Sequence, residues 1–176
     1  MKSAIKKGKL GENLVKNKLK EFKFLLNDST IKIGDNHTTQ IDHIVFTKKY
    51  IYVIETKHYS GKIIEKGLYW KQKGFKKNYT LYSPIAQNEA HIYSLSRVLN
   101  IDITNFKSII VFTGSAKLKI KSENVIQLCS LLKYIKKSQK KSKFTLNSKK
   151  MYKIIRNIRM KKGKKTNKRH IKNLKR

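Results

Sequence analysis

Two carboxylates and a lysine stand close together in one stretch of the chain, which reads QIDHIVFTKKYIYVIETK over residues 40–57. Asp42 lies near its start, while Glu55 and Lys57 lie at its end, separated by one residue. Carboxylate oxygens are suitable ligands for a hard cation such as Mg²⁺. An ammonium group beside such a cation can orient a nucleophile or stabilise developing negative charge. These residue types are therefore suited to the attack of water on a phosphodiester.

The same stretch predicts the β-hairpin that would position these side chains. Residues 40–47 and 50–57 are rich in Ile, Val, Tyr, Phe and Thr, which is typical of half-buried strands. The two lysines between them are the natural turn, and a two-residue turn would place Asp42 directly opposite Glu55. Because side chains alternate along a strand, Lys57 would share their face. A three-residue turn would break this alignment.

Facing carboxylates on a hairpin repel each other, so the predicted arrangement needs a compensating group. A divalent cation or a shared proton would supply it. The alternative is that Asp42 and Glu55 are solvated charges at the ends of an exposed face. The hairpin alone leaves both interpretations open.

Further motifs accompany the hairpin in a fixed order along the chain. They are GE at 11–12, QIDHI at 40–44, IETK at 54–57, YSGKI at 59–63, Trp70, and SPIAQN at 83–88. Together they resemble the nuclease-related domain, often called NERD, a family of the PD-(D/E)xK restriction-endonuclease-like superfamily. The resemblance covers roughly residues 8–115. It implies an α/β three-layer core in which helices flank a central mixed sheet.

The resemblance also implies an activity and a cofactor. It predicts a divalent-metal-dependent nuclease with DNA as the expected substrate. Asp42 and Glu55 would hold Mg²⁺, with Mn²⁺ as a possible substitute, and the Thr56 carbonyl would add a ligand. Lys57 would position or activate water.

Two more residues enter the candidate site through the resemblance. It implies that Glu12, on the first helix, approaches the metal as a third acidic group. On its own chemistry, Glu12 would stabilise the helix dipole or pair with Lys16. Similarly, the resemblance places Gln87 near the active face, whereas an early-helix glutamine is otherwise simply a surface residue.

The surrounding sequence predicts the elements that would support this site. Apolar spacing predicts a helix from about Lys9 to Phe22, after a loose basic start. Ser83 and Pro84 open a second helix as N-cap and first residue, and it ends near Asn100. The remaining predictions are short strands at 24–26 and 30–33 around a turn at 27–28, a buried strand at 107–113, and a helix at 125–135 containing a buried Cys129.

Composition points to an anionic partner. The 176 residues carry a net charge of +33, with 43 Lys and Arg against 10 Asp and Glu, which favours nucleic acid. A membrane surface is the other candidate, although no apolar run is long enough to span a bilayer. The first residues lack the apolar core of a secretory signal, and the single cysteine excludes an internal disulfide. A cytoplasmic location fits these features.

The charge is concentrated toward the C-terminus. Residues 133–176 contain 20 Lys and Arg and no Asp or Glu. We therefore predict a nuclease-related domain over residues 1–132 and a basic, partly helical or disordered tail over 133–176 that binds phosphates without reading sequence. The candidate nucleic-acid-binding residues are Lys62, Lys71, Lys73, Lys76, Lys77, Arg156, Arg159, Lys161, Lys162, Lys164, Lys165 and Arg169.

Aromatic residues are interleaved with the lysines of residues 70–79. Trp70, Phe75 and Tyr79 would either stack on bases or cover the core, and for Trp70 we favour the core. The function hypothesis is thus a metal-dependent nuclease, and the alternative is a non-catalytic nucleic-acid-binding protein of the same fold. The acidic pair favours the nuclease, because a pure binder has no need of carboxylates facing a polyanion.

Overall fold

The computed structural model describes residues 2–33, 37–75, 77–140 and 145–160, with side chains from residue 5 onward. Its main sheet has five strands in the order β1 (Leu25–Ile33), β2 (His37–Phe46), β3 (Ile51–Lys57), β7 (Phe106–Phe112) and β9 (Val125–Gln127). A smaller sheet has the order β6 (Asn78–Tyr82), β5 (Tyr69–Lys73), β4 (Lys62–Ile64) and β8 (Lys117–Lys119). The helices are α1 (Lys2–Leu19), α2 (Pro84–Leu99), α3 (Leu131–Gln139) and α4 (Ser148–Ile158), with 3-10 turns at Ile103–Asn105 and Leu128–Ser130.

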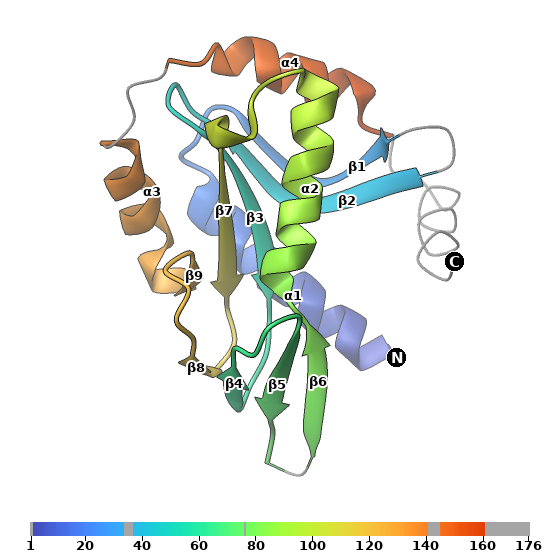
Figure 1. Ribbon diagram of the computed structural model, residues 1–176, viewed down its shortest axis with the longest axis vertical. Helices are drawn as coiled ribbons and strands as arrows, with labels where there is room; N and C mark the ends of the chain where they lie inside the picture. The colour runs from blue at the N-terminus through green and yellow to red at the C-terminus, as the bar shows by residue number, and fades with distance from the viewer. Residues whose placement is uncertain (1, 34–36, 76, 141–144, 161–176) are drawn as a thin grey trace.

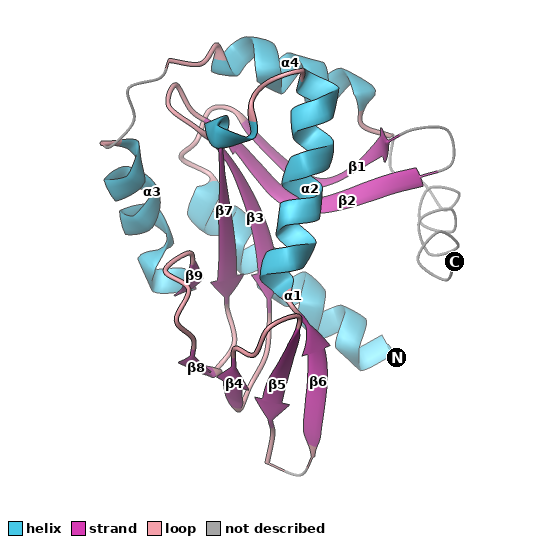
Figure 2. Cartoon of the chain, in the orientation of Figure 1, coloured by secondary structure: helices cyan, strands magenta, loops and turns pink. Residues whose placement is uncertain are grey.

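Helices cover both faces of the main sheet, as Figures 1 and 2 show. On one face α2 and α4 pack on β1–β3 through residues such as Ile44, Val53 and Leu95. On the other face α1 and α3 pack through residues such as Val15 and Ile135. The sheet is mixed, since β1–β2–β3 run antiparallel and β3–β7–β9 parallel. The predicted α/β core with a central mixed sheet is therefore confirmed.

The predicted hairpin and its register are present. The ladder pairs His43 with Ile54 and Phe46 with Ile51, and the Thr47 N–H donates to the Tyr50 carbonyl at 3.0 Å across the two-residue turn. The second helix also has the predicted ends. Its N-cap Ser83 accepts a hydrogen bond from the Ala86 N–H, Pro84 is the first residue, and Asn100 ends the helix in the left-handed conformation.

Three local predictions were wrong. The first helix begins at Lys2, so residues 2–8 are helical and Glu12 lies beyond its first turn. The turn expected at 27–28 is absent, because β1 runs through it with Asp28 at a φ of 46°. In the segment predicted as a helix from 125 to 135, residues 125–127 form β9 and the helix starts only at Leu131, which leaves Cys129 exposed.

The folded part of the chain continues past the predicted boundary after residue 132. That boundary falls inside α3, whose Ile135 is fully buried, and the segment predicted as a partly helical or disordered tail contains α4, which buries Ile155. Residues 161–176 lie outside the described ranges. None of the helices within those ranges is long and apolar enough to cross a membrane.

The smaller sheet extends from one end of the main sheet and carries the interleaved aromatic residues. A separate core cluster, including Ile63, Trp70 and Phe112, joins the two sheets. Trp70 is 1% exposed, so its predicted role in packing is confirmed, whereas Phe75 and Tyr79 are exposed. The β5–β6 hairpin projects from the molecule in Figure 1.

His43 should make the protein sensitive to acid. It is 2% exposed, its Nδ1 lies 2.7 Å from Asn27 Oδ1, and burial lowers its pKa from 6.5 to about 4. Because the unfolded state then binds more protons, the free energy of unfolding falls as pH drops from 6.5 toward 4. We expect this histidine to account for a loss of about 2 kcal/mol at pH 5.

Thermal unfolding of wild type and His43→Gln at pH 7.5 and pH 5 measures this effect. The variant should lose less stability on acidification than wild type. Gln substitution of exposed His37 serves as the control. Equal acid sensitivity of wild type and His43→Gln would contradict the assignment.

Candidate active site

The acidic pair lies just beyond the last pair of the β2–β3 ladder, with Asp42 in the middle of β2 and Glu55 near the end of β3. Continuing the β2–β3 register by one residue puts Asp42 opposite Glu55, as predicted. The Thr56 N–H donates to Asp42 Oδ2 at 2.8 Å, which fixes the Asp42 carboxylate against β3. Glu55 is 4% exposed and Asp42 is half-buried. The interpretation of these residues as solvated surface charges is therefore wrong.

Lys57 joins the acidic pair to α2. Its Nζ donates to Glu55 Oε1 at 2.7 Å and to Gln87 Oε1 at 3.0 Å, so Lys57 and Gln87 share the site with Glu55. Burial would lower the Lys57 pKa, but the charge and hydrogen bond of Glu55 outweigh burial and raise it. Lys57 is therefore an ammonium at neutral pH, suited to stabilising charge or orienting water rather than to accepting a proton.

The pKa of Asp42 is raised by burial and by neighbouring carboxylates. Burial raises it well above the usual value, the Glu55 charge raises it further, and Glu12 adds to the effect. The Thr56 N–H and the Lys57 charge oppose this shift without cancelling it. Asp42 thus lies in the electrostatic field of two further carboxylates, and Glu12 acts on the site from α1.

Gly11 allows α1 to come this close. A Cβ at this position would lie 2.7 Å from Thr113 Oγ1 and 2.9 Å from His58 Cβ, distances that real side chains avoid. The His58 ring is itself occupied, with Nδ1 2.9 Å from Thr113 Oγ1. His58 therefore lies beside the site, with its ring directed to Thr113 and away from Lys57.

Two residues of α2 that were not among the predicted site residues, His91 and Asn88, also shape the site. His91 Nε2 lies 3.7 Å from Glu55 Oε2, and His91 Nδ1 lies 2.6 Å from Thr39 Oγ1. The buried Asn88 donates through Nδ2 to the Val53 carbonyl and to Ser108 Oγ, both at 2.8 Å, which anchors α2 to the sheet. Spacing could have found His91, since it is four residues after Gln87 and shares its helix face.

The oxygen donors suit a magnesium ion. The Thr113 N–H donates to the Lys57 carbonyl, so the backbone groups of Lys57 face β7. Successive residues of a strand direct their N–H and carbonyl groups to opposite sides, so the Thr56 carbonyl, like its N–H, faces the side of Asp42. Among the described residues, no group of three or more His, Cys, Asp and Glu side chains has the spacing of a metal site. Mg²⁺ nevertheless needs only one or two carboxylates besides water, and the raised Asp42 pKa marks a place where added positive charge would be stabilising.

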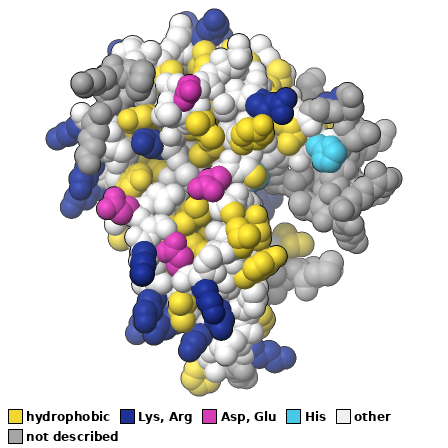
Figure 3. Space-filling model, viewed as in Figure 1, with side chains coloured by type: hydrophobic (Ala, Val, Ile, Leu, Met, Phe, Trp, Pro, Cys, Tyr) yellow, Lys and Arg dark blue, Asp and Glu magenta, His cyan; other side chains and the backbone are white. Residues whose placement is uncertain are grey.

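The predicted nucleic-acid-binding residues divide between two ends of the molecule. Lys62, Lys71, Lys73 and Lys77 are exposed on the smaller sheet, and Figure 3 shows Lys and Arg side chains gathered at that end. Exposed Arg156 and Arg159 belong to the α4 end, on the opposite side in Figure 1. The other candidates, Lys76, Lys161, Lys162, Lys164, Lys165 and Arg169, lie outside the described residues.

A mixed sheet covered by helices, with Asp42 in the middle of β2 and with Glu55 and Lys57 at the end of the adjacent β3, is consistent with the restriction-endonuclease-like class. The chain belongs to the nuclease-related domain family, which it matches over residues 7–113. An uncharacterized protein of Bacillus anthracis is 39% identical over 95 residues, which is 51% of this chain and 45% of that protein. This chain thus matches less than half the length of that relative. No solved structure gives a significant match.

Proposed function

We propose that the protein is a divalent-metal-dependent nuclease that hydrolyses phosphodiester bonds of nucleic acid, with DNA as the expected substrate. The observation that carries the proposal is the pairing of Asp42 and Glu55 beside a charged lysine. Family membership supports a nuclease-related function. The raised Asp42 pKa adds a reason for a cation, since two carboxylates and a nearby third are costly to bury together.

In this proposal Asp42 and Glu55 hold Mg²⁺, with the Thr56 carbonyl as a further ligand. The ion would neutralise phosphate charge and lower the pKa of water. Lys57 orients the attacking water and stabilises the charge that develops on the phosphate. Gln87 holds the Lys57 ammonium in place through its side-chain oxygen.

The lysines of the smaller sheet would track the phosphate backbone next to the site. Such contacts raise affinity without reading sequence, and their contribution falls with salt. The basic segment 161–176 would add to this binding.

Incubation of purified protein with supercoiled plasmid, single-stranded DNA and RNA tests the proposal. Each substrate is run with Mg²⁺, Mn²⁺ and EDTA, beside Glu55→Gln, which keeps the size of the side chain and removes its charge. We expect cleavage by wild type in either metal, none in EDTA, and at least a ~100-fold loss in the variant. A salt-dependent gel shift without cleavage in any metal would overturn the proposal and favour the non-catalytic binding protein.

A further inference from the structure

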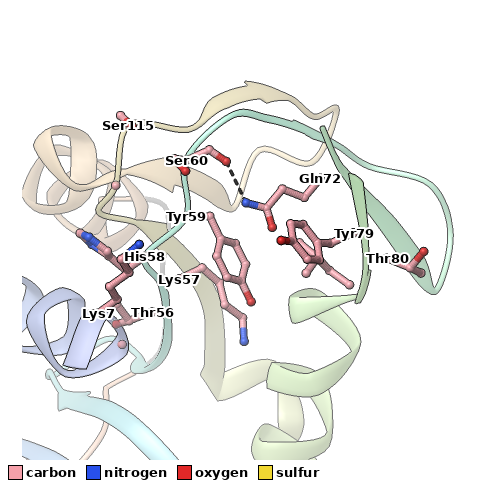
Figure 4. Close-up of a pocket in the computed structure, with 13 residues that line it drawn as sticks. Lys7, Thr56, Lys57, His58, Tyr59, Ser60, Gln72, Tyr79, Thr80 and Ser115 are labelled. Atoms are coloured by element: carbon pink, nitrogen blue, oxygen red, sulfur yellow. Dashed lines mark hydrogen bonds between the residues drawn. The ribbon is translucent and has the colours of Figure 1, made fainter. Parts of the chain in front are cut away.

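A cavity of about 750 Å³ opens directly beside Lys57, and it is distinct from the space between the carboxylates. Its walls come from the N-terminal part of α1, the segment after β3, the β5–β6 hairpin and the loop after β7. Figure 4 shows the side chains that line it. The volume falls within the range of about 300–1,000 Å³ that is typical of small-ligand sites. A group bound there would be adjacent to a phosphate held at Lys57.

Two tyrosines give this cavity aromatic walls. Tyr59 enters from the segment after β3 and Tyr79 from β6, and both extend toward the space above Lys57 (Figure 4). The Tyr59 ring packs against Phe112 with centroids 6.2 Å apart. The loop behind it fits closely, because a Cβ on Gly114 would lie only 2.1 Å from the Tyr59 carbonyl oxygen. Tyr59 is therefore held in place, whereas Tyr79 is 54% exposed and available for contact.

Polar groups accompany the rings. Gln72 pairs with Tyr79 across β5 and β6, and its Nε2 donates to the Ser60 carbonyl at 2.9 Å, which fixes the amide at the cavity wall. Lys7 and Ser115 also line the space. Aromatic faces, amide and hydroxyl groups and a cation together match a nucleobase, which stacks through its faces and hydrogen-bonds through its edges.

We propose that this cavity binds an unpaired nucleobase next to the scissile phosphate, so that the protein acts on single-stranded rather than fully paired nucleic acid. This inference rests on the proposed nuclease function, since only a nuclease cleaves the phosphate beside Lys57. A base inside a duplex is stacked on both faces and paired at its edge, so it can reach the cavity only after leaving the helix. Single strands present their bases without that cost.

Binding in EDTA tests the inference without depending on cleavage. The probes are a fluorescein-labelled oligothymidylate and a labelled blunt-ended DNA duplex, and their binding is followed by fluorescence anisotropy in moderate salt. We expect Tyr79→Ala to weaken binding of the single strand about tenfold, in line with the loss of one stacked base, and to change duplex binding by less than twofold. Tyr79→Phe, which retains the ring, should bind both probes like wild type.

Tyr82 supplies the matched control. It lies on the same strand and is 55% exposed, but it pairs with Tyr69 and is not part of the cavity wall. Tyr82→Ala should leave single-strand binding within twofold of wild type. Equal losses in Tyr79→Ala and Tyr82→Ala, or an equal loss on both probes, would overturn the inference. If Tyr79→Ala weakened binding of the single strand alone and wild type cleaved nothing in Mg²⁺ or Mn²⁺, only the nuclease proposal would be overturned.

Discussion

Replacement of Lys57 by alanine is expected to slow cleavage by about 10²–10³-fold while binding of nucleic acid is largely retained. The ammonium lies within hydrogen-bond distance of Glu55 and Gln87 but is one charge among many basic groups on this protein. Loss of one pre-positioned donor at a reacting centre costs about 10²–10³ in rate. Single-turnover cleavage in Mg²⁺ and anisotropy in EDTA, measured on the same preparation, would separate the two effects.

The Lys57 substitution also removes the ammonium that lies 2.7 Å from the Glu55 carboxylate. A buried carboxylate without its ion-pair partner lowers the stability of the folded protein. The double variant Lys57→Ala/Glu55→Gln removes that charge and serves as a folding control. Lys66→Ala, at an exposed position near the smaller sheet, is the matched lysine control and should cleave normally. Cleavage by Lys57→Ala at the wild-type rate would refute the role of this residue, as would a loss of binding in proportion to the loss of rate.

Substitution of Asp42 by asparagine is expected to stabilise the metal-free protein above neutral pH. Burial and the Glu55 charge raise the Asp42 pKa, so the folded state prefers the protonated acid. The stability contributed by this group is therefore present at low pH and is lost as pH rises through the folded-state pKa. Asparagine is neutral throughout and retains an oxygen to accept the Thr56 N–H. We expect a gain on the order of 1 kcal/mol at pH 8, or about 2–4 °C in Tm.

The same variant tests the cation site without an activity assay. Mg²⁺ or Mn²⁺ should raise the Tm of wild type, because an ion that binds only the folded state stabilises it, and should leave Asp42→Asn unchanged. Glu89→Gln removes an exposed carboxylate from α2 and should respond to metal like wild type. A metal-induced rise in Tm that survives in Asp42→Asn would place the cation elsewhere. A lower Tm of Asp42→Asn than of wild type at pH 8 would contradict the electrostatic argument.

The parts of the fold that sequence predicted well are those with local signals. The two-residue turn fixed the hairpin register, and that register alone aligned Asp42 with Glu55. Serine and proline at 83–84 marked the start of α2, which carries Gln87 to Lys57. The distance between Lys57 and Gln87 could not be derived, because it depends on how α2 lies on the sheet. His91 was missed although a signal was present, because its spacing of four residues from Gln87 places the two side chains on one face of α2.

Long-range pairing explains the other errors. Residues 125–127 form a strand because β7 offers them a parallel partner, and apolar content alone does not distinguish that strand from a helix. Charge likewise proved a poor guide to where folding ends. α3 and α4 are rich in lysine, yet each needs only one or two buried side chains, such as Ile135 and Ile155, to join the core. The composition change after residue 132 marks a change in charge, and the folded region runs through it.

The end of α4 has a consequence for self-association. β1 is an outer strand of the main sheet, and an outer strand with unpaired backbone groups is a template for another chain. Here Arg159 forms an antiparallel bridge with Ile31, and the Met160 N–H donates to the Thr30 carbonyl at 2.8 Å. The residues after α4 therefore shield part of this strand against intermolecular β-pairing. A truncation designed to remove basic charge should begin after Met160, because a shorter chain would expose an aggregation-prone edge.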